Sequence, residues 1–232
     1  MTPQPTIPRR YDSTGRRARA AETRRHVVRV AHALFVERGY AASTVADIAA
    51  RSGVSTPTVF SAFGSKAGLL KACIDVALAG DDAPVPVADR PLARWVYETR
   101  DPVELLGRYA TMMGVLARQV GPIYDVLVRA ADAERDLTEL LSDFERQRLR
   151  AATMLAEAIA ERNGLPAGVS VEAARDVVWV LNAPELYASL SRKRRWSQRR
   201  YVNWARDALV KMLVQPATAG PVPPFVGRPG PG

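Results

Sequence analysis

The stretch from Ser43 to Phe63 constrains the fold more than any other part of the chain. Ser43 or Thr44 can cap a short helix, and Gly53 ends that helix because glycine adopts left-handed backbone angles at little cost. Ser55 can then cap a second short helix that reaches Phe63. Two short helices joined by a tight glycine turn predict a helix-turn-helix.

Helical periodicity continues on both sides of this stretch. Val27, Ala31 and Leu34 share one side of a first helix that is expected from about Ala21 and that ends at Gly39. Nowhere do Val, Thr and Tyr alternate with polar residues as they do in a strand, so we expect an all-α fold of about nine to ten helices. Outside the helix-turn-helix, the expected helices span about residues 21–39, 65–80, 90–98, 102–119, 122–132, 136–162, 170–191 and 197–213.

Composition divides the chain into four parts. Residues 1–20 carry prolines and arginines with almost no apolar side chains, which predicts a flexible basic arm. Residues 215–232 are rich in proline and glycine and are expected to form a disordered tail. Between them we expect a helix-turn-helix domain over residues 21–79 and a second helical domain over residues 80–214.

Positive charge concentrates in the first third of the chain. The formal net charge is +9, and twelve Lys and Arg residues but only four Asp and Glu residues lie between Met1 and Lys71. Such a segment favours a polyanion, usually nucleic acid, because neutralising phosphates releases condensed counterions. An anionic membrane surface would suit this charge as well. No apolar run is long enough for a secretory signal or a membrane span, so we expect a cytoplasmic protein without a membrane partner.

Residues with catalytic or metal-binding chemistry are sparse. Cys73 lies in an apolar run and is expected to be a core residue, without a disulfide partner. His26 and His32 are six residues apart, hence not on one helix face, and no cysteine or carboxylate cluster accompanies them. We find no phosphate-cradling glycine loop and no nucleophile with a base. The sequence therefore predicts neither an enzyme nor a metal or cofactor site.

One run of residues has a recognisable pattern: Thr44-Val-Ala-Asp-Ile-Ala-Ala-Arg-Ser-Gly-Val-Ser-Thr-Pro-Thr-Val-Phe-Ser-Ala-Phe-Gly-Ser-Lys66, which follows a helix ending in Phe35-Val-Glu-Arg-Gly-Tyr40. It resembles the signature of the TetR (tetracycline-repressor) family over about residues 22–75. The pattern has a physical basis, because Ala49 lets the two short helices approach, Gly53 makes the turn and Val59 locks the second helix against the first.

The resemblance implies a fold and a function for the whole chain. It implies a three-helix, helix-turn-helix DNA-binding domain followed by a helical domain for effector binding and dimerisation. Such a protein is a homodimeric transcriptional regulator, typically a repressor, that binds double-stranded operator DNA. Its operator affinity is modulated by a small-molecule effector, whose identity the resemblance does not give. Beyond about residue 75 the resemblance carries over architecture and little else.

The resemblance also implies where DNA would be contacted. The second short helix would enter the major groove, while the starts of neighbouring helices would meet phosphates. The alternative for Thr44 and Ser55 is plain helix capping, and for Lys66 a solvated surface lysine. The residues assigned to DNA are Thr44, Ser55, Thr56, Thr58, Phe60 and Lys66.

The chain departs from the usual family pattern on this helix. Phe60 stands where a tyrosine is common and Ala62 where a histidine is frequent, so residues 56–63 carry no Arg, Lys, Asn or Gln for bidentate base readout. We therefore expect specificity to depend on thymine-methyl and shape contacts. The hypothesis for the basic arm is that its arginines enter the adjacent minor groove, and the alternative is a disordered solubilising segment. Those arginines are Arg16, Arg17 and Arg19.

Candidate effector and dimer residues follow from the expected helices of the second domain. Each pocket candidate could equally be ordinary core, although Tyr124 and Asn182 have polar groups that a ligand could satisfy. The effector-pocket candidates are Trp95, Met112, Met113, Leu116, Tyr124, Leu127, Trp179 and Asn182. The dimer-interface candidates, on the last two long helices, are Val178, Leu186, Leu190, Trp204 and Leu209.

A rival interpretation belongs to a different functional class. The chain could be a helical ligand-binding or scaffold protein whose basic arm binds a membrane or nucleic acid. Vesicle binding without sequence-selective DNA binding would favour that alternative.

Overall fold

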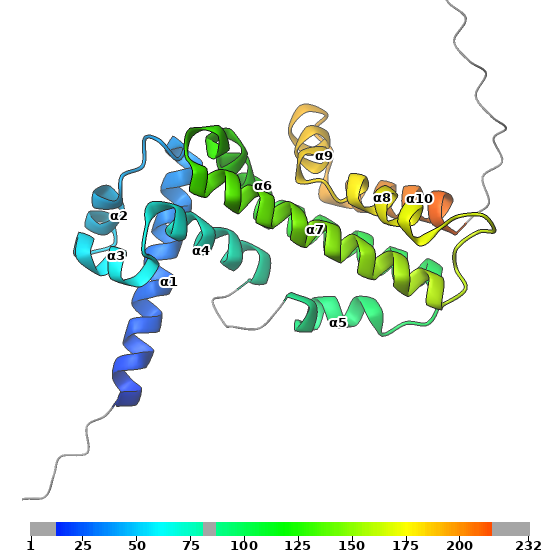
Figure 1. Ribbon diagram of the computed structural model, residues 1–232, viewed down its shortest axis with the longest axis horizontal. Helices are drawn as coiled ribbons and strands as arrows, with labels where there is room; N and C mark the ends of the chain where they lie inside the picture. The colour runs from blue at the N-terminus through cyan, green and yellow to red at the C-terminus, as the bar shows by residue number, and fades with distance from the viewer. Residues whose placement is uncertain (1–12, 81–86, 215–232) are drawn as a thin grey trace, which may run out of the picture.

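A computed structural model describes residues 13–80 and 87–214, which form helices and connecting turns without a strand (Figure 1). The all-helical prediction is therefore confirmed for these ranges. None of the helices within them is long and apolar enough to cross a membrane. The α-helices are α1 (Ser13–Arg38), α2 (Val45–Arg51), α3 (Thr56–Phe63), α4 (Lys66–Ala79), α5 (Pro91–Tyr97), α6 (Pro102–Ala130), α7 (Arg135–Glu161), α8 (Val171–Leu181), α9 (Pro184–Ala188) and α10 (Gln198–Leu213).

Side-chain caps start the three helices that follow α1. The Asp47 N–H donates to Thr44 Oγ1 at 3.0 Å at the start of α2. The Thr58 N–H donates to Ser55 Oγ at 3.3 Å at the start of α3. The same relation recurs at α4, where the Gly68 N–H donates to Ser65 Oγ at 2.9 Å. These caps satisfy amide groups that have no partner inside the helix.

Ser43 and Gly53 show how the turns around α2 are made. Ser43 is buried, and its hydroxyl donates to the Gly39 carbonyl at 2.8 Å, so Thr44 rather than Ser43 is the cap of α2. Gly53, between α2 and α3, has a φ of 66°, in the left-handed region that favours glycine. The predicted helix-turn-helix is present.

The head, residues 13–80, shares its apolar core with the second domain. Buried residues of α1 to α4, such as Phe35 and Leu70, belong to one cluster with Ile123 and Leu127 of α6 and Phe144 of α7. This apolar cluster therefore extends across the expected boundary near residue 80. A second cluster lies further along, where α8 and α10 pack on α6 and α7.

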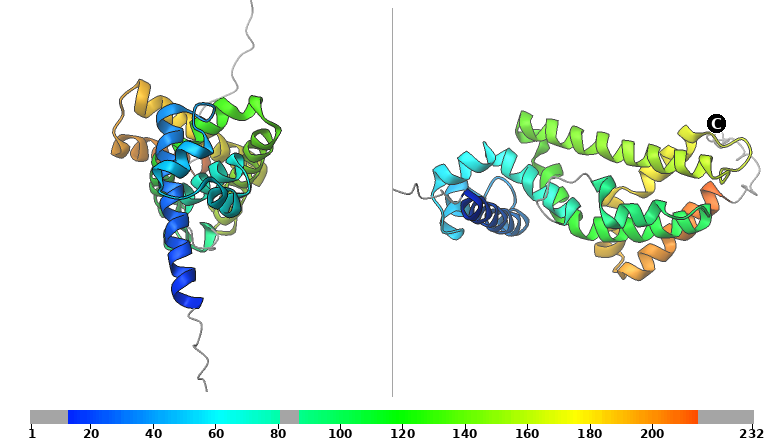
Figure 2. Two further views of the ribbon diagram at one scale, coloured as in Figure 1. Left: turned by 90° about the vertical axis from the view of Figure 1, so that its left-hand side faces the viewer. Right: turned by 90° about the horizontal axis from the view of Figure 1, so that it is seen from below.

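Helix α6 runs through the second domain, with α7 beside it and α10 crossing it (Figure 2). Gly114 marks the close approach of α6 and α10, because a Cβ there would lie only 2.6 Å from Val202 Cγ2. Glycine at this position lets the two helices pack more closely than a larger residue would allow.

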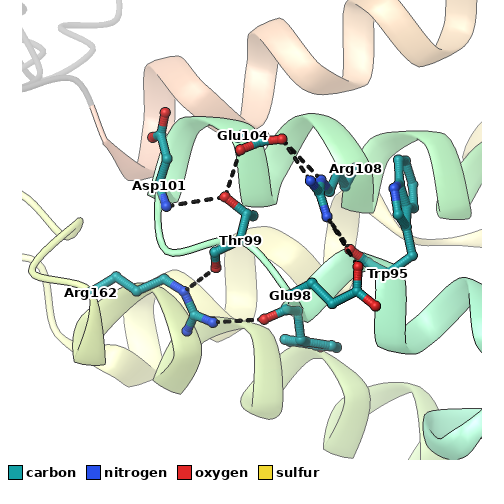
Figure 3. Close-up of polar contacts among 8 residues, drawn as sticks. Trp95, Glu98, Thr99, Asp101, Glu104, Arg108 and Arg162 are labelled. Atoms are coloured by element: carbon teal, nitrogen blue, oxygen red, sulfur yellow. Dashed lines mark hydrogen bonds and ion pairs between the residues drawn. The ribbon is translucent and has the colours of Figure 1, made fainter.

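Polar contacts hold the short helix α5 against α6 and the end of α7 (Figure 3). The Thr99 hydroxyl donates to Glu104 at 2.6 Å, and the Arg108 guanidinium donates both to Glu104 and to the Trp95 carbonyl, the latter at 2.6 Å. Arg162, directly after α7, donates to the Tyr97 carbonyl at 3.1 Å and to the Thr99 carbonyl at 3.0 Å. Backbone carbonyls that α5 leaves open at its end are thus satisfied by arginine side chains.

Three predicted boundaries are wrong. Helix α1 begins at Ser13, so the expected arm is helical from that residue onward. Its preceding residues, like the predicted tail over 215–232, lie outside the described part of the chain. Helix α6 continues through Pro122, where two helices were expected. Conversely, the expected helix over 170–191 is divided: α8 ends at Leu181, and Pro184 occupies the first turn of α9, where its missing N–H costs little.

Candidate nucleic-acid interface

Helix α3 carries the exposed polar edge of the head. Val59 is 2% exposed and anchors the helix on the core, as predicted. Ser55 and Thr58 are exposed, Thr56 is half-buried, and Phe60 has 47% of its surface exposed. The Ser55 and Thr58 hydroxyls lie 2.8 Å apart and hydrogen-bond each other at the start of the helix. This edge of α3 thus presents the Ser55 and Thr58 hydroxyls and the Phe60 ring to solvent.

Thr44 lies at the corresponding position of α2. It is exposed and caps the helix, and its hydroxyl also donates to the Asp47 carboxylate at 2.7 Å. The capping alternative is therefore realised at Thr44. Its neighbour Asp47 brings a negative charge to the same turn.

Lys66 begins α4, but it is not a free surface lysine. The Lys66 ammonium lies 4.1 Å from the centroid of the Tyr40 ring and is half-buried. Burial lowers the pKa of Lys66, and the Glu134 carboxylate opposes that shift. The side chain is held in place on an aromatic face, with donors left over for a further partner.

Arg24 is a residue that the sequence reasoning missed. From α1 its guanidinium donates to the Ala62 carbonyl near the end of α3 and lies 4.2 Å from the centroid of the Phe63 ring. A cleft of about 560 Å³ lies between α1 and α3 beside this contact, lined among others by Thr23 and Ser61. The only signal in the sequence was the place of Arg24 on the polar side of the first helix.

The arginines of the expected arm lie on α1. Arg19 is exposed, while the side chains of Arg16 and Arg17 lie outside the described part of the structure. Figures 1 and 2 show the N-terminal part of α1 projecting beyond the other helices of the head. These basic residues therefore lie on a helix rather than on an irregular segment.

Tyr124 joins polar residues of three helices in the second domain. It is 3% exposed, and its hydroxyl lies 2.9 Å from Glu145 Oε1 of α7 and 2.7 Å from Glu185 Oε1 of α9. Burial and the two carboxylates raise the pKa of Tyr124. Arg148 completes the cluster with an ion pair of 2.6 Å to Glu145. Periodicity could not have identified Glu145 or Glu185, because contacts between helices leave no pattern in the sequence.

Asn182 lies at the end of α8 and donates to the Tyr109 hydroxyl at 3.2 Å. Tyr109 is 1% exposed, and burial raises the pKa of its hydroxyl. Both polar pocket candidates, Tyr124 and Asn182, therefore have partners within the chain.

The remaining pocket candidates are spread over the second domain. Met113 and Leu127 are buried in different core clusters, and Met112 and Leu116 are half-buried. Trp95 and Trp179 are about two-fifths exposed, at 38% and 37%, and each has a guanidinium over its ring. The residues come from several helices and do not form one continuous cluster in the described structure.

Two of the dimer candidates are corrected by their burial. Val178 and Leu209 are 0% exposed within one chain, so their own neighbours already cover them and a partner cannot touch them. Leu186, Leu190 and Trp204 are half-buried and retain exposed surface.

Comparison with known proteins finds a family match within the head. The model for "Bacterial regulatory proteins, tetR family" matches residues 27–73. An HTH-type transcriptional repressor of Mycobacterium tuberculosis is 39% identical over 100 residues, which are 40% of this chain and 51% of that protein. The chain thus spans about half the length of the curated relatives it matches.

Solved structures resemble the chain over most of its length. NalD, the secondary repressor of the MexAB-OprM multidrug efflux pump in Pseudomonas aeruginosa, has a TM-score of 0.66 at 18% identity, covering 85% of this chain and 98% of NalD. The transcriptional regulator FadR from Bacillus subtilis, in complex with stearoyl-CoA, has a TM-score of 0.64 at 14% identity, covering 83% of this chain and 99% of FadR. At these identities the likeness establishes the fold of both domains.

Proposed function

Because this chain belongs to the TetR family of bacterial regulatory proteins, we propose that it represses transcription by binding operator DNA through its head and releasing it when an effector binds. The matched family model describes bacterial regulatory proteins, and the curated relative is a transcriptional repressor, which supports a regulator rather than an enzyme. The observation that carries the proposal is the exposed edge of α3, anchored by Val59 inside the segment that the family model matches. A protein with this function acts in the cytoplasm, where operator DNA lies.

Base recognition is assigned to the exposed edge of α3. Ser55 and Thr58 supply hydroxyls for phosphates or base edges, and the exposed ring of Phe60 suits a thymine methyl group. No charged or amide side chain is present in Thr56–Phe63, so DNA shape contributes much of the specificity.

Phosphate contacts are assigned to Lys66 and to α1. Lys66 lies at the start of α4, where its charge adds to the positive end of the helix. Arg19 is exposed on the projecting part of α1. Because this part is helical, we replace the hypothesis of an arginine arm threading the minor groove with phosphate contacts along a helix.

Effector binding is assigned to the helices of the second domain. FadR, which shares this fold, was solved with stearoyl-CoA. In this chain Tyr124 and Asn182 are the polar groups on α6 and α8 that can exchange internal hydrogen bonds for bonds to a ligand. Met112, Met113 and Leu116 are apolar candidates on α6.

A homodimer is assigned to the surface of α8, α9 and α10. Leu186, Leu190 and Trp204 are half-buried there, and Met212 of α10 is 52% exposed. We expect Met212→Glu to yield monomers at micromolar concentration, because a carboxylate would be buried in the interface. Met154→Glu, on α7 and 46% exposed in the wild type, is the matched control and should remain dimeric in analytical ultracentrifugation. If both variants remained dimeric, the interface would lie elsewhere on the protein.

Selection of genomic fragments by the purified protein tests the function as a whole. We expect enrichment of a few sites with twofold symmetry, and the genes beside them would indicate the effector. Equal affinity for every duplex offered would overturn the proposal. Vesicle binding without sequence-selective DNA binding would instead favour a scaffold protein with a membrane-binding basic segment.

A further inference from the structure

A hydrogen bond joins the head to the second domain at the end of α1. The Tyr40 hydroxyl donates to Glu134 Oε2 at 3.0 Å, although the two residues are 94 positions apart. Tyr40 follows α1, and Glu134 immediately precedes α7. Figure 1 shows this end of α1 beside the turn between α6 and α7.

The Tyr40 ring is a fixed platform. It is 5% exposed, and it stacks on Phe35 with ring centroids 5.7 Å apart. Stacking holds the ring on one side, and the bond to Glu134 holds its hydroxyl. Burial and the Glu134 carboxylate raise the pKa of Tyr40, which keeps the hydroxyl a donor.

The Lys66 ammonium rests on this platform, 4.1 Å from the ring centroid. Attraction to the ring face and to the nearby Glu134 carboxylate offsets the cost of its partial burial. A lysine restrained in this way loses little side-chain freedom when it meets a phosphate, whereas a free lysine loses more.

We propose that Glu134 and Tyr40 are positioning residues for Lys66: the bond from the second domain fixes the ring that aims the ammonium at an operator phosphate. The inference rests on the proposed function. It makes the start of α7 part of the DNA-binding machinery, so displacement of α7 within its domain changes the phosphate contact directly.

The sign of one substitution distinguishes this role from general electrostatics. Glu134→Ala removes a negative charge, which by simple attraction would strengthen DNA binding. The positioning role predicts the opposite, a loss of about threefold in operator affinity, because Lys66 loses its support. Glu139→Ala is the matched control, since Glu139 lies five residues further along, on α7, and in the described structure it pairs with Arg135 at 2.9 Å.

The experiment measures operator affinity of the full chain as a function of salt, on a site obtained by genomic selection. Lys66→Gln is expected to lower affinity about 3–10-fold and to reduce the salt slope by about 1. Tyr40→Phe, which keeps the ring and removes the hydroxyl, should share part of this loss. Neither Tyr40→Phe nor Glu134→Ala should weaken binding further in the Lys66→Gln background.

Three results would overturn the inference. Glu134→Ala could bind more tightly than the wild type, Tyr40→Phe and Glu134→Ala could both bind with the affinity and salt slope of the wild type, or their effects could add fully to that of Lys66→Gln. Thermal melting of each variant by circular dichroism checks that the fold persists. Failure of the wild type to select any operator would instead reject the proposed function.

Discussion

Ser55 combines two roles, because the same hydroxyl caps α3 and lies on its exposed edge. The two roles can be separated by substitution. Ser55→Ala removes the cap and should lower the free energy of unfolding by about 1 kcal/mol. Ser55→Asp keeps a capping oxygen and should preserve stability, but its carboxylate would face DNA phosphates and lower operator affinity about tenfold or more.

Denaturant unfolding and operator titration of both Ser55 variants check this prediction. If Ser55→Asp bound the operator as well as the wild type, the start of α3 would not face the DNA backbone. Asp47→Asn on α2 is a useful comparison, since it changes charge by the same amount in the opposite direction.

The Cys73 thiol is predicted to be unreactive toward alkylating reagents in the folded protein. It is 1% exposed, and burial raises the pKa of its thiol from 9.0 to about 12. At pH 8 the thiolate fraction falls about a thousandfold, so alkylation by iodoacetamide should be slower by at least that factor than in denaturant. Mass spectrometry of samples quenched over time measures the two rates. Equal rates would show that α4 opens readily.

Local chemistry made several residues of the head predictable. Thr44 and Ser55 cap helices, and Gly53 makes a left-handed turn. Each of these roles depends on only a few neighbouring residues. Arg24 and Tyr40 were not predictable as contacts, because their partners Ala62 and Glu134 lie far along the chain. Periodicity shows which side of a helix is buried but not what covers it.

At the scale of elements, proline had opposite effects in two helices. Pro122 removes one hydrogen bond from α6, yet the helix continues because α4, α9 and α10 pack along it. Pro184 ends the helical run after α8 and begins a new helix. From the sequence we expected a break before Pro122 and none at Pro184, and the structure shows the reverse, because tertiary packing decides whether a helix breaks at a proline.

The crossing of α6 and α10 can be tested at Gly114. Gly114→Ala raises helix propensity by about 1 kcal/mol, but its Cβ would approach Val202 Cγ2 to 2.6 Å. We expect net destabilisation of about 1–3 kcal/mol. Gly107→Ala, on the same helix, meets only the Arg206 side chain at 3.6 Å and should be neutral or stabilising. Thermal melts of the pair report the difference, and equal stability would mean that the two helices separate easily.

On the scale of the whole molecule, the shared core predicts one cooperative unit. Residues 13–80 contribute most of the first cluster, but Ile123 and Leu127 of α6 and Phe144 of α7 close it. The full chain should therefore melt in one transition. The isolated fragment 13–80 should lack a sharp transition, since each large apolar side chain left uncovered costs about 1.5–3 kcal/mol. A fragment that melts cooperatively at the temperature of the full chain would contradict this.

The straight N-terminal part of α1 also affects how much DNA the protein would cover. Residues from Ser13 to Ala20 lengthen α1 by about 12 Å, at a rise of about 1.5 Å per residue. A rod cannot curl around the duplex edge, so it can shield the backbone on one side only. That length corresponds to about three to four base pairs. Hydroxyl-radical footprints should therefore be longer by this amount at each end of the operator, and on one DNA strand only.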